Sequence, residues 1–125
     1  MDRNQKIPCI LTLLYMIVLA GGSLLPLSIE TEVFSGSDKL IHFALYTPLG
    51  FLLSLPKMFS SGFLNFAVPL AFGSSYGASM EVLQNFATGR TASVYDAVAN
   101  VLGVGIGLGI GGTRAWMKER TKARK

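Results

Sequence analysis

Four apolar stretches separated by short polar segments dominate the chain. They cover residues 7–27, 38–55, 63–85 and 94–116. Each is close to the roughly 20 residues that an α-helix needs to cross a hydrocarbon core of about 30 Å. The pattern predicts an all-α integral membrane protein, a bundle of four transmembrane helices with short loops that forms one domain over residues 1–125.

The segments between these stretches carry residues that start and end helices. The second stretch follows the sequence Ser-Gly-Ser-Asp, in which Ser37 or Asp38 can cap the free amides of the helix. Residues 56–62 mark a short turn and residues 87–93 form the last loop. Pro48 falls inside the second stretch, where it predicts a kink and a freed carbonyl group that a neighbouring helix must satisfy.

The first stretch has a competing interpretation as a cleavable signal peptide. Residues 20–22 are small and follow an apolar run, as cleavage sites do. The apolar run continues through Leu24 and Leu25 beyond these small residues. We therefore expect a retained first helix, and cleavage of residues 1–20 stays an open alternative.

Composition supports the membrane interpretation. Only 14% of the residues are charged and 50% are hydrophobic, whereas soluble domains carry about 25% charged residues. The single cysteine, Cys9, offers neither a disulfide framework nor a CxxC motif, and no cofactor is expected. The net charge of +4 does not indicate nucleic-acid binding, because the basic residues cluster beside the apolar stretches.

The 11 Lys and Arg residues predict the orientation of the chain. Most lie near the termini or in the turn after the second stretch, and only Lys39 and Arg90 fall on the opposite side. Because cytoplasmic segments retain positive charge, we expect a multi-pass protein of the bacterial cell membrane with both termini in the cytoplasm. Residues 117–125 then form a basic cytoplasmic tail, interpreted as a topological anchor rather than a site for anionic lipid or nucleic acid.

Other ionisable and amide side chains gather at the predicted outer ends of the second, third and fourth helices. Residues three or four apart share a helix face, so each helix presents a polar pair there. A charged group inside a bilayer costs at least about 2.5 kcal/mol and usually faces another polar group or water. We therefore expect a polar pocket that opens to the outer surface. Its expected binding residues are Asp38, Lys39, His42, Glu81, Gln84, Arg90, Ser93, Asp96 and Asn100.

Two alternative roles for these polar residues stay open. Interhelical hydrogen bonds hold membrane bundles together at about 0.6 kcal/mol each, and for Asp96 and Asn100 this structural role fits as well as a binding role. Lys39 and Arg90 also fit groups that reach headgroup water. Neither role explains why the polar residues lie at one depth. Glu81 also fits the second role poorly, because it lies inside its predicted helix rather than at the end.

Alternating glycines occupy the fourth stretch. They do not form a dinucleotide-binding loop, because such a loop needs a preceding strand. Gly103, Gly107 and Gly111 form consecutive GxxxG steps, and Gly105 with Gly109 forms another step on a second face. These faces predict close helix packing within the bundle and leave a homo-oligomer open.

Three spaced motifs account for the polar set. They are Asp-Lys-x-x-His from Asp38, Glu-x-x-Gln from Glu81, and Arg-x-x-Ser-x-x-Asp-x-x-x-Asn-x-x-Gly from Arg90 to Gly103. Together they resemble the VanZ-like family of small bacterial membrane proteins. The resemblance covers residues 38–112 and adds little for the first helix or the tail. It implies a multi-spanning envelope protein, in a family whose namesake is connected with teicoplanin resistance.

The leading functional hypothesis is an outer-leaflet site that binds, and in one version modifies, an anionic lipid or a polyprenyl-linked cell-envelope precursor, with an influence on glycopeptide susceptibility. Lys39 and Arg90 would neutralise a phosphate. His42, Glu81 and Asp96 are the candidate catalytic residues, since a histidine paired with a carboxylate can transfer protons. No enzyme signature is present, so enzymatic activity stays open. No metal site is expected, because one histidine with carboxylates is weak evidence for one.

The alternative hypothesis is a non-enzymatic membrane accessory or interaction module. It would pack through the glycine-rich fourth helix, and the short loops also favour it. A proton or ion path is less favoured, because the inner halves of the predicted helices lack ionisable residues.

Overall fold

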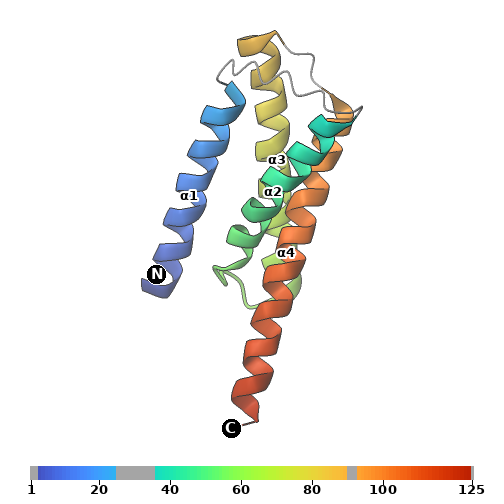
Figure 1. The fold of residues 1–125 in the computed structure, drawn as a ribbon. Helices are drawn as coiled ribbons and strands as arrows, with labels where there is room; N and C mark the ends of the chain where they lie inside the picture. Colours follow the sequence, from blue (N-terminus) through green and yellow to red (C-terminus); the bar gives the residue numbers. More distant parts are fainter. Residues whose placement is uncertain (1–2, 25–35, 90–92, 125) are drawn as a thin grey trace.

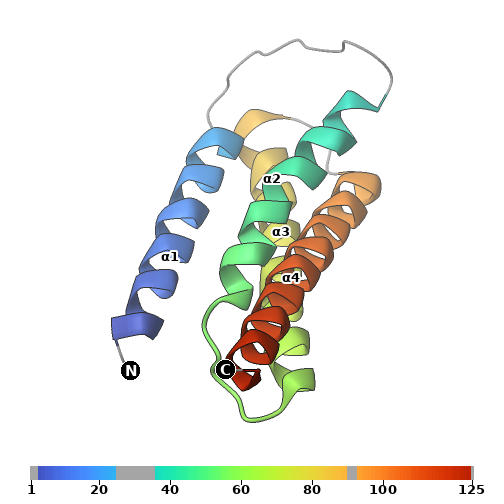
Figure 2. The same ribbon diagram turned by 60° about the horizontal axis from the view of Figure 1, so that its bottom comes forward.

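The described part of the chain, residues 3–24, 36–89 and 93–124 of a computed structural model, folds into helices and contains no strand. The helices are α1 (Arg3–Leu24), α2 (Ser37–Ser54), α3 (Gly62–Thr88) and α4 (Val94–Ala123). They confirm the predicted all-α class. In Figure 1, α2, α3 and α4 lie together, α1 stands to one side, and both termini are at the same end of the bundle. Figure 2 shows α2 between α1 and α4 from a second direction.

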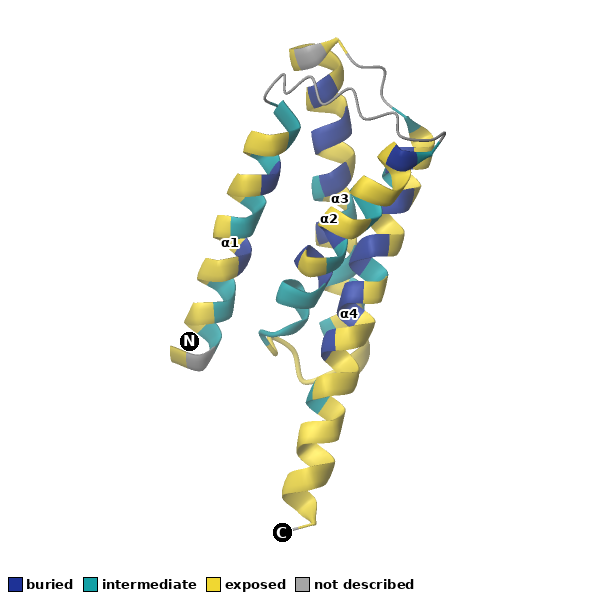
Figure 3. Cartoon of the chain, in the orientation of Figure 1, coloured by how far each residue is buried: buried dark blue, intermediate teal, exposed yellow. Residues whose placement is uncertain are grey.

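Two of these helices, α1 and α4, are long and apolar enough to span a bilayer. The outward face of α1 carries Leu14, Ile17 and Val18, whose exposed fractions are 53%, 60% and 67%. Exposed positions cover the outer faces of the bundle, and buried positions lie where the helices face one another (Figure 3). Soluble proteins rarely expose contiguous apolar surface, so these faces fit a hydrocarbon environment.

The buried apolar core is small and lies mainly where α2 meets α4. Leu49 and Val104 are fully buried there, together with Tyr46 and Leu108, and Leu19 extends the cluster to α1. So few large buried side chains mean that the bundle depends on close contact between helix backbones. In membranes this contact replaces the hydrophobic effect as the source of association.

One glycine face of α4 makes this close contact possible. A Cβ atom at Gly107 would overlap the Thr47 carbonyl oxygen, and one at Gly103 would lie 2.7 Å from the Phe43 carbonyl oxygen. A Cβ atom at Gly111 would overlap the side chain of Ser54. The structure therefore places the first predicted GxxxG face of α4 directly against α2.

The second glycine face of α4 does not pack in this way. A Cβ atom at Gly105 would meet only the end of Leu70, at 3.9 Å, and one at Gly109 would meet nothing within 4 Å in the described residues. The two predicted faces therefore differ, because α2 covers only one side of α4.

Several predicted helix boundaries are wrong. The third helix continues past residue 85 to Thr88 and ends where Gly89 adopts the left-handed conformation (φ 69°), a common way to close a helix. The fourth helix continues past residue 116 to Ala123. Polar composition suggested a separate tail, but Lys, Arg, Glu and Ala are good helix formers and no glycine or proline interrupts them. Lys57, after α2, donates a hydrogen bond to Glu119 in this extension.

The beginnings of the first two helices also differ from the predictions. α1 starts at Arg3 rather than at residue 7, because polar helix formers extend it, and its predicted end at 25–27 lies outside the described residues. Ser37 and Asp38 do not cap α2. Gly36 occupies the cap position with φ 99°, a conformation that glycine adopts without steric cost.

Pro48 lies in the middle of α2, as predicted. One turn before it, the Leu45 carbonyl oxygen accepts a hydrogen bond of 2.8 Å from the Tyr15 hydroxyl of α1. A second tyrosine, Tyr76 of α3, donates to the Met16 carbonyl oxygen of α1 at 2.6 Å. The carbonyl group that Pro48 leaves without its α-helical donor is that of Ala44, four residues earlier, so the Tyr15 hydroxyl bonds to the next carbonyl group along α2. These two hydroxyl groups also hold α1 to the rest of the bundle.

Candidate functional site

Four polar side chains meet near the start of α2, toward the end of α3 and near the start of α4. In Figure 1 these parts of the helices lie at the end of the bundle opposite the termini. This polar cluster consists of His42 from α2, Glu81 from α3, and Asp96 and Asn100 from α4. All four belong to the set that the sequence predicts to share one site. Helical spacing predicted only that these side chains lie at the same depth, and the structure brings them together.

The imidazole ring of His42 lies at the centre of the polar cluster. Its Nδ1 atom is 3.0 Å from Oδ1 of Asn100 and 3.3 Å from Oε1 of Glu81. Its Nε2 atom is 3.9 Å from Oδ2 of Asp96. One ring edge thus faces an amide and a carboxylate, and the other faces a second carboxylate.

The polar cluster is almost closed to its surroundings. Glu81, Asp96 and Asn100 are 6%, 8% and 1% exposed. Two of the buried atoms, Oε1 of Glu81 and Nδ2 of Asn100, have no hydrogen-bond partner among the described residues. A buried polar atom without a partner costs about 1–3 kcal/mol. The cluster therefore holds spare hydrogen-bonding or ligand-binding capacity.

The local sequence explains how α4 contributes two side chains. Ser93 caps the helix, because its Oγ accepts a hydrogen bond of 3.4 Å from the Asp96 amide. Asp96 and Asn100 then follow one turn apart on a single face. The next residue on that face, Gly103, lets this part of α4 reach α2. Ser93 thus has a structural position at the helix start, outside the polar cluster.

Glycines of α3 bring the third helix close enough to complete the cluster. A Cβ atom at Gly77 would lie 3.1 Å from Cβ of Asn100, and one at Gly73 would lie 2.9 Å from the Val104 side chain. Gly73 and Gly77 were not among the packing residues predicted from the sequence. Their Gly-x-x-x-Gly spacing was the signal that could have identified them.

The remaining predicted binding residues take different places. Gln84 is buried, but its Nε2 donates a 3.1 Å hydrogen bond to the Ser23 carbonyl oxygen of α1, so it fastens the first helix. Asp38 is exposed at the start of α2. Lys39 is also exposed there, and its Nζ atom lies 5.8 Å from the centre of the Tyr95 ring. Arg90 lies outside the described residues.

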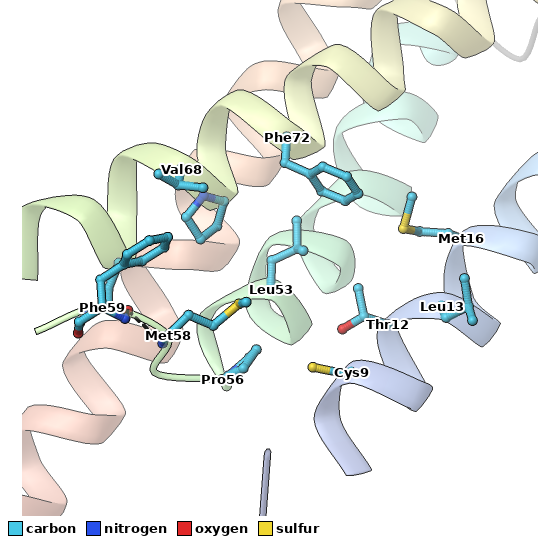
Figure 4. Close-up of a pocket in the computed structure, with 12 residues that line it drawn as sticks. Cys9, Thr12, Leu13, Met16, Leu53, Pro56, Met58, Phe59, Val68 and Phe72 are labelled. Carbon is cyan, nitrogen blue, oxygen red and sulfur yellow. Dashed lines mark hydrogen bonds between the residues drawn. The ribbon is translucent and has the colours of Figure 1, made fainter. Parts of the chain in front are cut away.

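An apolar hollow of about 400 Å³ lies far from the polar cluster, between α1, α2 and α3 (Figure 4). Cys9, Thr12 and Phe72 are among its lining residues. The Thr12 hydroxyl donates to the Pro8 carbonyl oxygen at 2.8 Å, so it is already used within α1. The hollow offers apolar surface and little chemistry, which leaves the polar cluster as the candidate functional site.

Comparison with known proteins places this arrangement in a family. The family model described as VanZ/LLP1 matches residues 10–113. The match includes most of α1, to which the motif resemblance added little, and it contains the whole polar cluster. Neither the curated proteins nor the solved structures contain a match. The family match covers most of the chain, and the chain therefore belongs to the VanZ/LLP1 family.

Proposed function

We propose that this membrane protein binds the head group of an anionic lipid, or of a polyprenyl-linked cell-envelope precursor, at the polar cluster. The observation that carries the proposal is the convergence of His42, Glu81, Asp96 and Asn100 in one buried place. Charged side chains at membrane depth are expensive, and they are typical of substrate, ion or proton pathways.

The proposal includes a topology with four spans and both termini in the cytoplasm. Three observations support it. The termini lie at the same end of the bundle, and the basic residues of α4 extend beyond its apolar part at that end (Figure 1). α1 and α4 each have the length and composition of a span. The polar cluster would then lie in the outer leaflet, as the positive-inside rule requires.

The rim of the polar cluster supplies a positive charge for a phosphate. Lys39 is exposed beside Tyr95, so its ammonium group can approach a bound head group without leaving the interface. Arg90 would add a second, bidentate contact in this proposal. If the bound lipid is an envelope precursor, an effect on glycopeptide susceptibility follows, because occupancy of the site changes how much precursor is accessible.

Native mass spectrometry of the protein released from membranes tests this function. We expect the wild type to retain an anionic phospholipid or polyprenyl phosphate, and Lys39→Gln to retain less of it, because the phosphate loses its positive partner. Lys118→Gln removes an exposed lysine of the α4 extension, at the opposite end of the bundle, and is the matched control. Absence of any retained lipid in the wild type, or equal retention by Lys39→Gln, would contradict the proposal.

A second candidate function is an accessory module that packs through α4. It is favoured by the uncovered glycine face, where a Cβ atom at Gly109 would meet nothing within 4 Å in the described residues. In this case Gly109→Leu would abolish the cellular phenotype while lipid retention stays at the wild-type level. The reverse result, loss of phenotype in Lys39→Gln alone, favours the lipid site.

A further inference from the structure

We propose that the polar cluster binds a divalent transition-metal ion, with Nε2 of His42 and one carboxylate oxygen each from Glu81 and Asp96 as ligands. For the role of the ion, this inference rests on the proposed function, because the ion would receive the phosphate of the head group. The sequence alone predicts no metal site. The structure gives reason to revise that expectation, since the three helices place ligand atoms together that are far apart in the chain.

The spacing of the three ligand groups suits a single ion. One atom each from His42, Glu81 and Asp96 lies within 4.8 Å of the other two. Two ligands at about 2.1 Å from a tetrahedral ion are about 3.4 Å apart. Nε2 of His42 and Oδ2 of Asp96 are 3.9 Å apart. A side-chain adjustment of less than about 1 Å would therefore bring this pair to coordination distance.

Asn100 gives the imidazole the orientation that a metal ligand needs. Nδ1 of His42 is 3.0 Å from Oδ1 of Asn100, which can only accept a hydrogen bond. With its hydrogen on Nδ1, the ring turns the Nε2 lone pair toward the Asp96 carboxylate. Two such acceptors repel each other unless a proton or a metal ion lies between them. Histidine ligands of metal ions usually donate their second ring N–H in this way, so Asn100 is a positioning residue.

The unpartnered carboxylate oxygen of Glu81 is an independent indication of a ligand. Glu81 is only 6% exposed, and its Oε1 atom is buried without a hydrogen-bond partner among the described residues. That atom lies 3.3 Å from Nδ1 of His42, on the ring edge opposite Asp96, so the Glu81 carboxylate must turn toward Nε2 to share an ion with Asp96. Buried charges in proteins are paired or coordinate metals. A divalent ion would balance the two negative charges of Glu81 and Asp96.

The ion also removes an electrostatic conflict in the proposed function. Two buried carboxylates repel an anionic phosphate, and Lys39 on the rim supplies one positive charge against them. A bound divalent ion makes the three-ligand set neutral. Three protein ligands leave a tetrahedral ion one open position, which a phosphate oxygen or water can take. One imidazole with two carboxylates suits Zn²⁺ or Mn²⁺ better than Ca²⁺ or Mg²⁺.

The single histidine of the chain makes the test direct. Full-length protein without a polyhistidine tag, labelled with ¹⁵N-histidine, is freed of metal by a chelator and titrated in micelles with ZnCl₂ or MnCl₂. Calorimetry is expected to give one ion per chain, and the ¹⁵N spectrum to show ligation through Nε2. We expect Glu81→Gln and Asp96→Asn to weaken binding by about tenfold or more, and Asn100→Ala by about 10- to 100-fold. Glu119→Gln is expected to bind as the wild type does.

Three results would overturn the inference: no stoichiometric binding by the wild type, equal binding by Glu81→Gln and Asp96→Asn, or ligation through Nδ1. The wild-type titration decides the question even if a variant fails to fold. Lipid retention, measured on metal-free and metal-loaded protein, separates this inference from the proposed function. Metal binding without lipid retention would leave the metal site and remove the lipid function. Lipid retention without metal binding would leave the lipid function and remove the metal site.

Discussion

Oδ1 of Asn100 lies 3.0 Å from Nδ1 of His42, and this contact joins the second turns of α4 and α2 inside the bundle. Asn100 is 1% exposed, so water cannot replace the amide if it is removed. The same residue lies against Gly77 of α3. One amide side chain thus orients the histidine at the point where the three helices meet.

We expect Asn100→Leu to destabilise the protein by about 1–3 kcal/mol, because the His42 ring N–H loses its acceptor in a closed site. Chemical unfolding in micelles measures the stability, and the ¹⁵N signals of His42 report the ring tautomer. Asn100→Asp is the comparison, since it keeps an oxygen that can accept from Nδ1. Wild-type stability and an unchanged histidine spectrum in Asn100→Leu would show that the contact has no structural role.

The contrast between the two glycine faces of α4 gives a second prediction. A methyl group at Gly107 overlaps the backbone of α2, whereas one at Gly109 meets nothing within 4 Å in the described residues. We expect Gly107→Ala to cost about 1–3 kcal/mol, the usual range for overpacking, and Gly109→Ala to cost nothing. Comparing the unfolding of both variants in micelles tests this. Equal stabilities would show that α2 and α4 are farther apart than the structure places them.

Helical spacing and hydropathy predicted the all-α class and the shared location of the polar residues. Spacing does not set how far each helix is rotated about its own axis. Glu81 and Gln84 therefore looked equivalent, yet Glu81 joins the polar cluster and Gln84 turns to the Ser23 carbonyl oxygen. Only the packing of α1 against α3 decides between these outcomes, and it depends on contacts distant in the sequence.

The exact ends of the helices and the close packing at the glycines of α3 were not predicted, and the reasons are local. The helix ends were misplaced because a change from apolar to polar residues marks the edge of a bilayer and not the end of a helix. α4 therefore continues to Ala123 through residues that favour helix. Gly73 and Gly77 were not predicted as a packing face, although they have the same four-residue spacing as the glycines of α4.

The attachment of α1 gives a third prediction. The Tyr76 hydroxyl donates to the Met16 carbonyl oxygen at 2.6 Å. Such bonds contribute about 0.6 kcal/mol in membranes, which corresponds to about a threefold change in an equilibrium. Cys9 is the single cysteine, is partly buried, and lines the hollow beside α1. We expect Tyr76→Phe to raise the maleimide labelling rate of Cys9 about threefold.

Tyr95→Phe is the control for that experiment, because Tyr95 is 72% exposed on α4 and far along the chain from α1. Its labelling rate should match the wild type. If Tyr76→Phe also matches the wild type while both variants keep their helical circular dichroism, the hydroxyl does not hold α1 in place.

The proposed topology leads to the last prediction. Lys39 is exposed at the end of the bundle that holds the polar cluster, and Lys118 is exposed on the α4 extension at the opposite end. In a Cys9→Ser background, a membrane-impermeant maleimide added to intact spheroplasts should label Lys39→Cys. It should label Lys118→Cys only after the membrane is opened, because the basic end faces the cytoplasm. Labelling of both positions from one side would mean that the bundle does not cross the bilayer. Labelling of Lys118→Cys alone from outside would invert the orientation and place the polar cluster in the inner leaflet, where an outer-leaflet precursor could not reach it.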